Sequence, residues 1–282
     1  MEFLDIILVP LSYPFMLKAI AVSSFVGATC ALLSCFLILK GWSLLGDAIS
    51  HAVLPGVVLA YIVGIPFSIG ALIFALLSVV LIGAVKRSTK IKEDAVMGIV
   101  FTTLFALGLV LISRTTSSVN LTHVLFGYVL GISDNAAFFT IAASAIVSLI
   151  VVLFHRTLLL FCFDPTHAQS IGVPVRFVHY MLLGLLAVTI TSSLQTVGII
   201  LVIAMLITPG STAFLLTKRF PPMLVIATIT SIVSSVSGAY LSYYLDISTG
   251  GAIVFIQGCL FTAVLFYTLA TQKSGRINRR AA

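Results

Sequence analysis

Residues 67–85 read FSIGALIFALLSVVLIGAV, a run of 19 residues that contains no Asp, Glu, Lys or Arg. About 20 apolar residues in an α-helix cross the roughly 30 Å hydrocarbon layer of a bilayer. A helix also satisfies its backbone N–H and C=O groups internally, which lipid cannot do for it. The run is longer than the roughly 10 residues of a membrane β-strand, so it predicts a transmembrane helix.

The same pattern recurs along the whole chain. Hydrophobic residues make up 60% of the 282 residues and charged residues 8%, against about 25% charged residues in a soluble domain. The sequence therefore predicts an all-α fold: one polytopic transmembrane domain over residues 1–282. The apolar stretch 121–131 is too short to span, and is expected to be re-entrant or to extend the next helix. We expect nine spans, or eight if one of the nine segments does not cross. The predicted spans are 11–39, 43–65, 67–85, 94–113, 132–154, 176–193, 196–217, 222–245 and 250–270.

The basic residues are distributed unequally between the two sides of this predicted bundle. Thirteen fall on one side and two, Lys18 and Arg114, on the other. Cytoplasmic loops carry the excess of Lys and Arg in membrane proteins, so the C-terminus is predicted to be cytoplasmic. The net charge of +7 is explained by these short loops, so lipid is expected as a partner and nucleic acid is not. The thirteen are Lys40, Lys86, Arg87, Lys90, Lys92, Arg156, Arg176, Lys218, Arg219, Lys273, Arg276, Arg279 and Arg280.

Asp47 and His51 are ionisable residues inside a predicted span, where such groups are costly and usually functional. Their i, i+4 spacing places both side chains on one helix face. Carboxylate oxygen and imidazole nitrogen together suit Mn²⁺, Fe²⁺ or Zn²⁺. Two ligands are few for one ion, and a symmetric dimer would supply four. The alternative is that Asp47 caps the helix and His51 bonds a neighbouring carbonyl.

Two prolines are expected to interrupt helices. Pro55 and Gly56 follow His51, and interrupted helices at membrane depth usually line a cavity enclosed by protein. Pro209 lies within a later apolar run, where it removes a backbone hydrogen bond and permits a kink. The alternative at Pro209 is an ordinary packing kink.

The longest connection on the basic side runs over residues 155–175. Asp164 is a favourable N-cap, Pro165 suits the first helical position, and Gly172 suits a C-cap. These signals predict a short helix of two turns at the membrane surface, in place of a plain loop. A rigid element in that position is expected to dock against another protein.

Three stretches together resemble the membrane permease subunits of bacterial ABC importers for manganese, iron and zinc. The first is residues 41–56, GWSLLGDAISHAVLPG, and the third is residues 197–213, VGIILVIAMLITPGSTA. The second is the surface helix, where the matching positions are Asp164, Pro165, Ala168, Gly172 and Pro174.

The resemblance implies a membrane-embedded transport subunit in the bacterial plasma membrane that is not itself an enzyme. Two permease chains, identical or paralogous, would form the pore, and cytoplasmic ATPase subunits would dock on a coupling helix at 164–174. An extracytoplasmic binding protein would deliver Mn²⁺, Fe²⁺ or Zn²⁺ to a site at Asp47 and His51. The metal would be cargo, with no permanently bound cofactor.

Two other functions fit the composition. A secondary carrier driven by protons or sodium would transport without an ATPase, but carriers usually bury several acidic residues, and Asp47 is the only acid placed well inside a span. A membrane-embedded metalloenzyme would need a further ligand and a catalytic water. The sequence contains no Gly-x-x-x-x-Gly-Lys-Ser/Thr motif, so this chain is not expected to bind nucleotide through a P-loop.

Overall fold

The computed structural model describes residues 9–114 and 129–280, and the regular structure of these ranges is helical throughout. Nine helices in the described ranges are long and apolar enough to cross a membrane, which confirms the predicted helical bundle. Most of the predicted short segment 121–131 lies outside the described residues. The spanning helices are α2 (Pro14–Lys40), α3 (Leu45–Ala52) joined to α4 (Leu54–Val63), α5 (Phe67–Ser88), α6 (Glu93–Arg114), α8 (Asp134–Leu153), α11 (Val175–Val197), α12 (Ile199–Leu216), α13 (Phe220–Leu245) and α14 (Thr249–Arg280).

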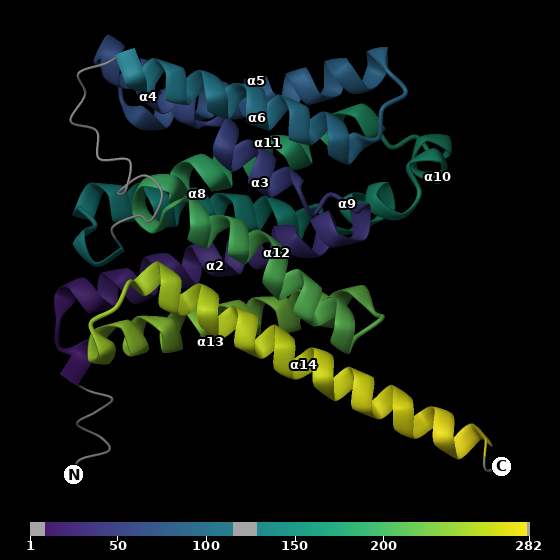
Figure 1. The fold of residues 1–282 in the computed structure, drawn as a ribbon. Helices are drawn as coiled ribbons and strands as arrows, with labels where there is room; N and C mark the ends of the chain where they lie inside the picture. The colour runs from purple at the N-terminus through teal and green to yellow at the C-terminus, as the bar shows by residue number, and fades with distance from the viewer. Residues whose placement is uncertain (1–8, 115–128, 281–282) are drawn as a thin grey trace.

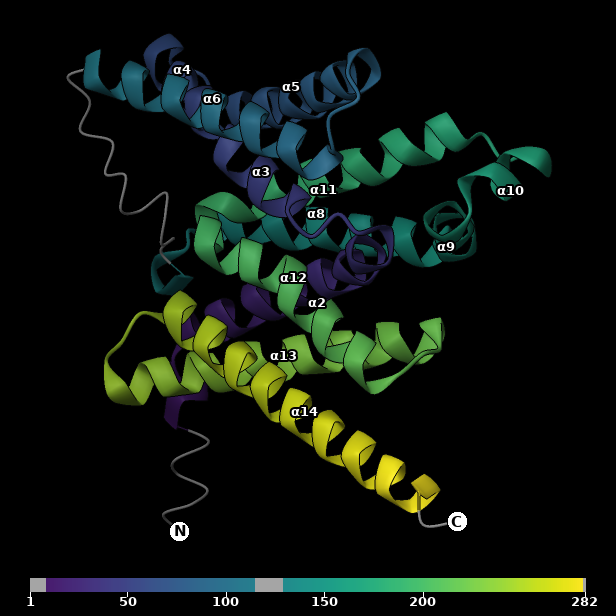
Figure 2. The ribbon, with the colours of Figure 1, turned by 45° about the vertical axis from the view of Figure 1, so that its right-hand side comes forward.

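The helices form two groups with α3 between them (Figures 1 and 2). One group is α4, α5 and α6, which contact one another. The other is α2, α12, α13 and α14, with α2 packed along both α12 and α13. The short helix α3 contacts α5 and α6 on one side and α11 and α12 on the other. The segment that carries Asp47 and His51 therefore joins the two halves of the bundle.

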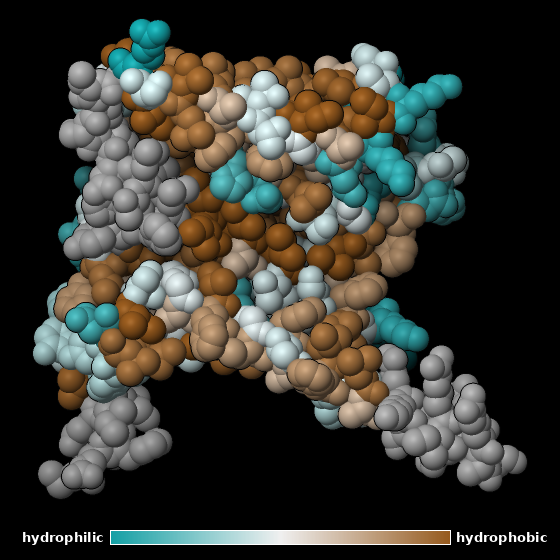
Figure 3. Space-filling model, viewed as in Figure 1, coloured by the Kyte–Doolittle hydropathy of each residue, from teal (hydrophilic) through white to brown (hydrophobic). Residues whose placement is uncertain are grey.

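Large apolar side chains remain exposed on the outer helices. Phe138 and Phe139 of α8 are 69% and 70% exposed, and Phe255 of α14 is 68% exposed. Figure 3 shows hydrophobic residues over much of the visible face. In a bilayer these faces meet lipid tails, and the helices keep their backbone hydrogen bonds internal. The exposed apolar side chains of the outer helices are thus consistent with a helical bundle that is surrounded by lipid.

The polar connections gather at one end of the bundle. The α5–α6 connection, the α12–α13 connection and α10 (Pro165–Ser170) lie together on the right in Figures 1 and 2. Hydrophilic residues concentrate at the upper right of the space-filling view (Figure 3). The connections predicted to face one side of the membrane therefore share one end of the molecule.

The interruption near Pro55 lies slightly earlier than the sequence predicted. Helix α3 ends at Ala52 and α4 begins at Leu54, so that only Val53 separates them. Pro55 occupies the first turn of α4, where its missing N–H would have no intrahelical partner anyway. Gly56 is helical, and its conformation does not break the chain. Gly56 instead allows α4 to approach α5, because a Cβ atom there would lie 2.2 Å from the Gly70 carbonyl oxygen.

The predicted break at Pro209 is corrected by the structure, because α12 continues through this residue. Ser34 of α2 supplies a polar group at the proline turn. Its hydroxyl accepts a hydrogen bond from the Gly210 N–H at 3.1 Å and donates one to the Ile207 carbonyl at 3.3 Å. Pro209 itself leaves free the carbonyl of the residue four positions earlier, so Ser34 bonds backbone groups next to the proline and not that carbonyl. Helix α12 is therefore tied to α2 at the turn that contains Pro209.

We expect Ser34→Ala to lower the stability of the folded bundle by about 1 kcal/mol, because the Gly210 N–H and the Ile207 carbonyl lose a buried partner. Thermal unfolding of the detergent-solubilised protein measures this loss. Ser78→Ala is the matched control, since Ser78 is also fully buried but its hydroxyl bonds only Ala75 of its own helix. Equal melting temperatures for the two variants would contradict the role of Ser34.

Candidate metal site

Helix α3 is short and has two distinct faces. Leu45, Ile49 and Ala52 are buried at helical spacing, which anchors one face in the bundle. Asp47 and His51 lie on a different face and are only partly buried, with side chains 31% and 26% exposed. The sequence pattern thus fixes which face carries the polar pair.

The Asp47 carboxylate and the His51 imidazole face each other. Asp47 Oδ1 lies 3.3 Å from His51 Nε2. Two ligand atoms that each lie about 2.1 Å from one ion, as N and O ligands of zinc do, are about 3.0–3.4 Å apart at bond angles of 90–109°. The separation therefore suits joint ligation of a first-row divalent cation, with little movement of either side chain.

Neither part of the alternative interpretation of this pair is present among the described residues. The N-cap of α3 is Leu44, which makes no side-chain cap bond, and Asp47 makes no hydrogen bond to the backbone of its helix. His51 Nδ1 is buried and has no hydrogen-bond partner in the described part of the chain. Asp47 therefore does not cap the helix, and His51 does not bond a backbone carbonyl, among the described residues.

Two aromatic rings of α6 pack against the imidazole. The centroid of Phe105 lies 5.3 Å from that of His51 in an edge-to-face arrangement, and that of Phe101 lies 5.9 Å away. The sequence analysis missed both residues, although their i, i+4 spacing within one predicted span places them on a common face. These rings restrict the orientation of the imidazole and make its surroundings apolar, which strengthens electrostatic interactions there.

One protomer supplies an incomplete set of ligands. No group of three or more His, Cys, Asp or Glu side chains suited to a metal occurs within residues 9–114 and 129–280. A structural or catalytic metal site usually has at least three protein ligands. Within the described ranges, Asp47 and His51 are thus the two candidate ligands at this position.

The predicted surface helix is present as α10. The Asp164 carboxylate accepts hydrogen bonds from the backbone N–H groups of Thr166 and His167 at 3.0 and 2.9 Å, and Pro165 occupies the first turn. Ala168 is fully buried, and its carbonyl accepts a hydrogen bond from the Val173 N–H.

The helix ends where the sequence signals placed its end. Gly172 has a φ of +87°, a conformation that glycine adopts without strain. Pro174 is the N-cap residue of α11. Helix α10 lies at the end of the bundle, well separated from α3 (Figures 1 and 2). The five residues thus belong to one capped short helix and the turn that follows it, and they do not share a site with Asp47 and His51.

Comparisons with known proteins match nearly the whole chain. The pattern of the ABC 3 transport family matches residues 12–268. The chain is 55% identical to the manganese transport system membrane protein MntB of Synechocystis sp., over 91% of this chain and 84% of that relative. It is 51% identical to the chelated iron transport system membrane protein YfeD of Yersinia pestis, over 92% of this chain and 87% of that relative.

The fold is also similar to a solved structure, that of PsaBC from Streptococcus pneumoniae in complex with Fab. The TM-score is 0.83 at 37% sequence identity, and the match covers 93% of this chain and 95% of the other.

Proposed function

Since this chain belongs to the ABC 3 transport family of metal-type ABC permeases, we propose that it is the permease subunit of an ATP-driven importer for a divalent transition metal. The observation that carries the proposal is the Asp47–His51 pair, 3.3 Å apart in a membrane-spanning segment. Mixed oxygen and nitrogen ligation admits Mn²⁺, Fe²⁺ and Zn²⁺ and does not separate them. The names of the manganese and iron relatives favour Mn²⁺ and Fe²⁺, with Zn²⁺ as a further candidate cargo.

The pore in this proposal is built from two permease chains. Because one protomer offers two ligands, a second copy or a paralogous chain related by two-fold symmetry contributes the equivalent pair. Asp47 and His51 then form half of a four-ligand site. Such a site binds the metal only during transport. When the two chains move relative to each other, the two pairs of ligands separate and the ion is released.

The remaining partners in the proposal act at opposite ends of the bundle. ATPase subunits dock against α10 at the cytoplasmic end, where Asp164, Pro165, Ala168, Gly172 and Pro174 give the segment its rigid shape. An extracytoplasmic binding protein delivers the metal at the other end. The orientation in the bacterial plasma membrane, with the C-terminus in the cytoplasm, follows from the distribution of Lys and Arg.

Transport in this proposal proceeds by alternating access. Closure of the ATPase dimer displaces α10, and the spanning helices move as packed units so that the pore opens to the other side. The ion passes from the outer opening to Asp47 and His51 and then to the cytoplasm.

The experiment that tests this function is metal uptake in cells that express this chain with its ATPase and its binding protein. We expect uptake of Mn²⁺ or Fe²⁺ to require all three proteins, and deletion of any one to reduce it to background. Uptake that persists without the ATPase would replace the importer with a secondary carrier. Uptake of none of Mn²⁺, Fe²⁺ and Zn²⁺ in the complete system would reject the proposal.

A further inference from the structure

Trp42 lies in the short connection between α2 and α3, and its backbone is fixed to both helices. Gly41 has a φ of +73° and ends α2. The Trp42 N–H then donates to the Leu37 carbonyl at 2.9 Å, and the Trp42 carbonyl accepts from the Leu45 N–H at 3.1 Å. Asp47 follows within the first turn of α3. A displacement of Trp42 is therefore passed directly to the start of the helix that carries the metal ligands.

The indole ring of Trp42 meets two rings that come from distant parts of the sequence. Trp42 is 4% exposed. Its ring centroid lies 5.3 Å from that of His179 in α11 and 6.4 Å from that of Phe161 in α9 (His155–Phe163), both edge-on. Phe161 and His179 are 5.9 Å apart. The three side chains thus form a closed aromatic triangle, in which each ring touches the other two.

The end of α2 is also attached to α9. Lys40 Nζ lies 4.3 Å from the centre of the Phe161 ring and donates a hydrogen bond to the Phe161 carbonyl at 3.2 Å. One residue further on, the Cys162 thiol contacts the Phe36 carbonyl at 3.8 Å. Cation–π contacts of this kind contribute about 0.5–2 kcal/mol each. Helix α9 is therefore attached to the end of α2.

Two residues of the aromatic triangle lie on either side of α10 in the sequence, one before it and one after it. Phe161 lies in the last turn of α9, just before Asp164 caps α10. His179 lies in the second turn of α11, shortly after α10 ends. Two of the three rings are therefore carried by the helices on either side of α10. A displacement of α10 would therefore reach both rings that contact Trp42.

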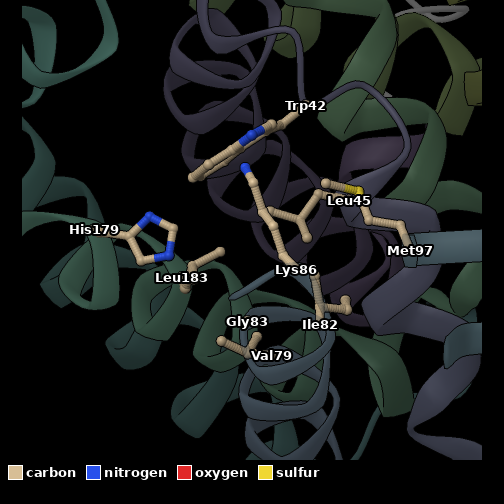
Figure 4. Close-up of a pocket in the computed structure, with 9 residues that line it drawn as sticks. All are labelled: Trp42, Leu45, Val79, Ile82, Gly83, Lys86, Met97, His179 and Leu183. Atoms are coloured by element: carbon tan, nitrogen blue, oxygen red, sulfur yellow. The ribbon is translucent and has the colours of Figure 1, made fainter. Parts of the chain in front are cut away.

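A cavity of about 30 Å³ borders Trp42 on the side of α5 and α6. Figure 4 shows His179 at one side of this cavity and Lys86 of α5 extending toward the Trp42 ring. A space of this size holds about one water molecule. The remaining lining is mostly apolar and consists of Leu45, Val79, Ile82, Gly83, Met97 and Leu183. The cavity therefore leaves a small space beside the indole, into which the ring can shift slightly.

We propose that Trp42, held by Phe161 and His179, is a positioning residue that transmits displacement of α10 to the metal-binding helix α3. The proposal rests on the proposed function, because it assigns the ATPase-driven movement to α10. Trp42 does not touch the metal in this arrangement. Its substitution is expected to change the number of metal ions moved per ATP hydrolysed.

The test compares metal ions moved per ATP hydrolysed by the complete complex in proteoliposomes, with Mn²⁺ as the transported ion. We expect Trp42→Leu to retain the ATPase rate within about twofold, while the number of ions moved per ATP falls by about tenfold. Phe36→Leu is the matched control, since Phe36 is a fully buried ring near the same end of α2 that packs on Phe220 instead. That control should keep the wild-type ratio of ions to ATP.

A second pair of variants keeps the test decisive if Trp42→Leu does not assemble. His179 is only partly buried, so His179→Ala should fold and should also lower the ratio, whereas His179→Phe keeps a ring in place and should restore it. A wild-type ratio in Trp42→Leu or in His179→Ala would overturn the proposal. Absence of ATP-dependent Mn²⁺ uptake by the wild-type complex would instead reject the proposed function itself.

Discussion

Asp47→Asn is expected to lower metal uptake by on the order of 100-fold or more. Mutation of a residue that only supports a metal ligand typically lowers metal affinity or activity by about 10–100-fold, and substitution of a ligand itself should cost at least as much. Asparagine keeps the size of the side chain but removes the negative charge. The imidazole of His51, 3.3 Å away, is then left with a neutral amide as its neighbour. In a pore of two identical chains the substitution changes two of four ligands at once, which explains the size of the effect.

The measurement is initial-rate uptake of Mn²⁺ into proteoliposomes that contain the complete complex. Asp47 has a side chain that is 31% exposed and does not bond its own backbone, so the variant should assemble and melt like the wild type. Asp246→Asn is the matched control: Asp246 is exposed at the end of α13, with a φ of +53° that asparagine also tolerates. Uptake by Asp47→Asn at the rate of this control would remove Asp47 from the site.

Gly56→Ala is expected to destabilise the bundle by about 3 kcal/mol or more, at the upper end of the usual cost of overpacking. The added Cβ would lie 2.2 Å from the Gly70 carbonyl oxygen and 2.9 Å from Phe74 Cβ. The contact is reciprocal, because a Cβ at Gly70 would lie 2.2 Å from the Gly56 carbonyl oxygen. Backbone atoms cannot rotate away as a side-chain end does, so α4 and α5 must separate.

We expect this loss as a fall of about 5–10 °C in the apparent melting temperature of the detergent-solubilised chain. Gly98→Ala in α6 introduces the same methyl group into a spanning helix, but no atom lies within 4 Å of the new Cβ. That variant should melt at or above the wild-type temperature. Equal melting temperatures for Gly56→Ala and Gly98→Ala would show that α4 and α5 do not pack through this glycine pair.

The sequence predicted the spans well because each is a local pattern. The run 67–85 became α5, Phe67–Ser88, and the signals at Asp164 and Gly172 became the ends of the α10 segment. The partners of Pro209 could not be predicted in the same way. Ser34, whose hydroxyl reaches that turn, lies more than 170 residues earlier in the chain, and no local pattern encodes the pairing.

The candidate metal site was predicted only in part for the same reason. Asp47 and His51 share one helix, so their i, i+4 spacing was sufficient to place them together. Phe105, which covers the imidazole, and the partners of Trp42 come from other helices. Their positions depend on how α6, α9 and α11 pack around α3, which is a property of the whole bundle.

The eight-residue length of α3 has a consequence for the order of biosynthesis. Isolated helices shorter than about 12–15 residues are marginal, so α3 takes its shape from its neighbours. Two of those neighbours, α11 and α12, begin at Val175 and Ile199 and are synthesised long after α3, since chains fold progressively from the N-terminus as they are made. Asp47 and His51 therefore gain their final geometry only when the later spans have entered the membrane.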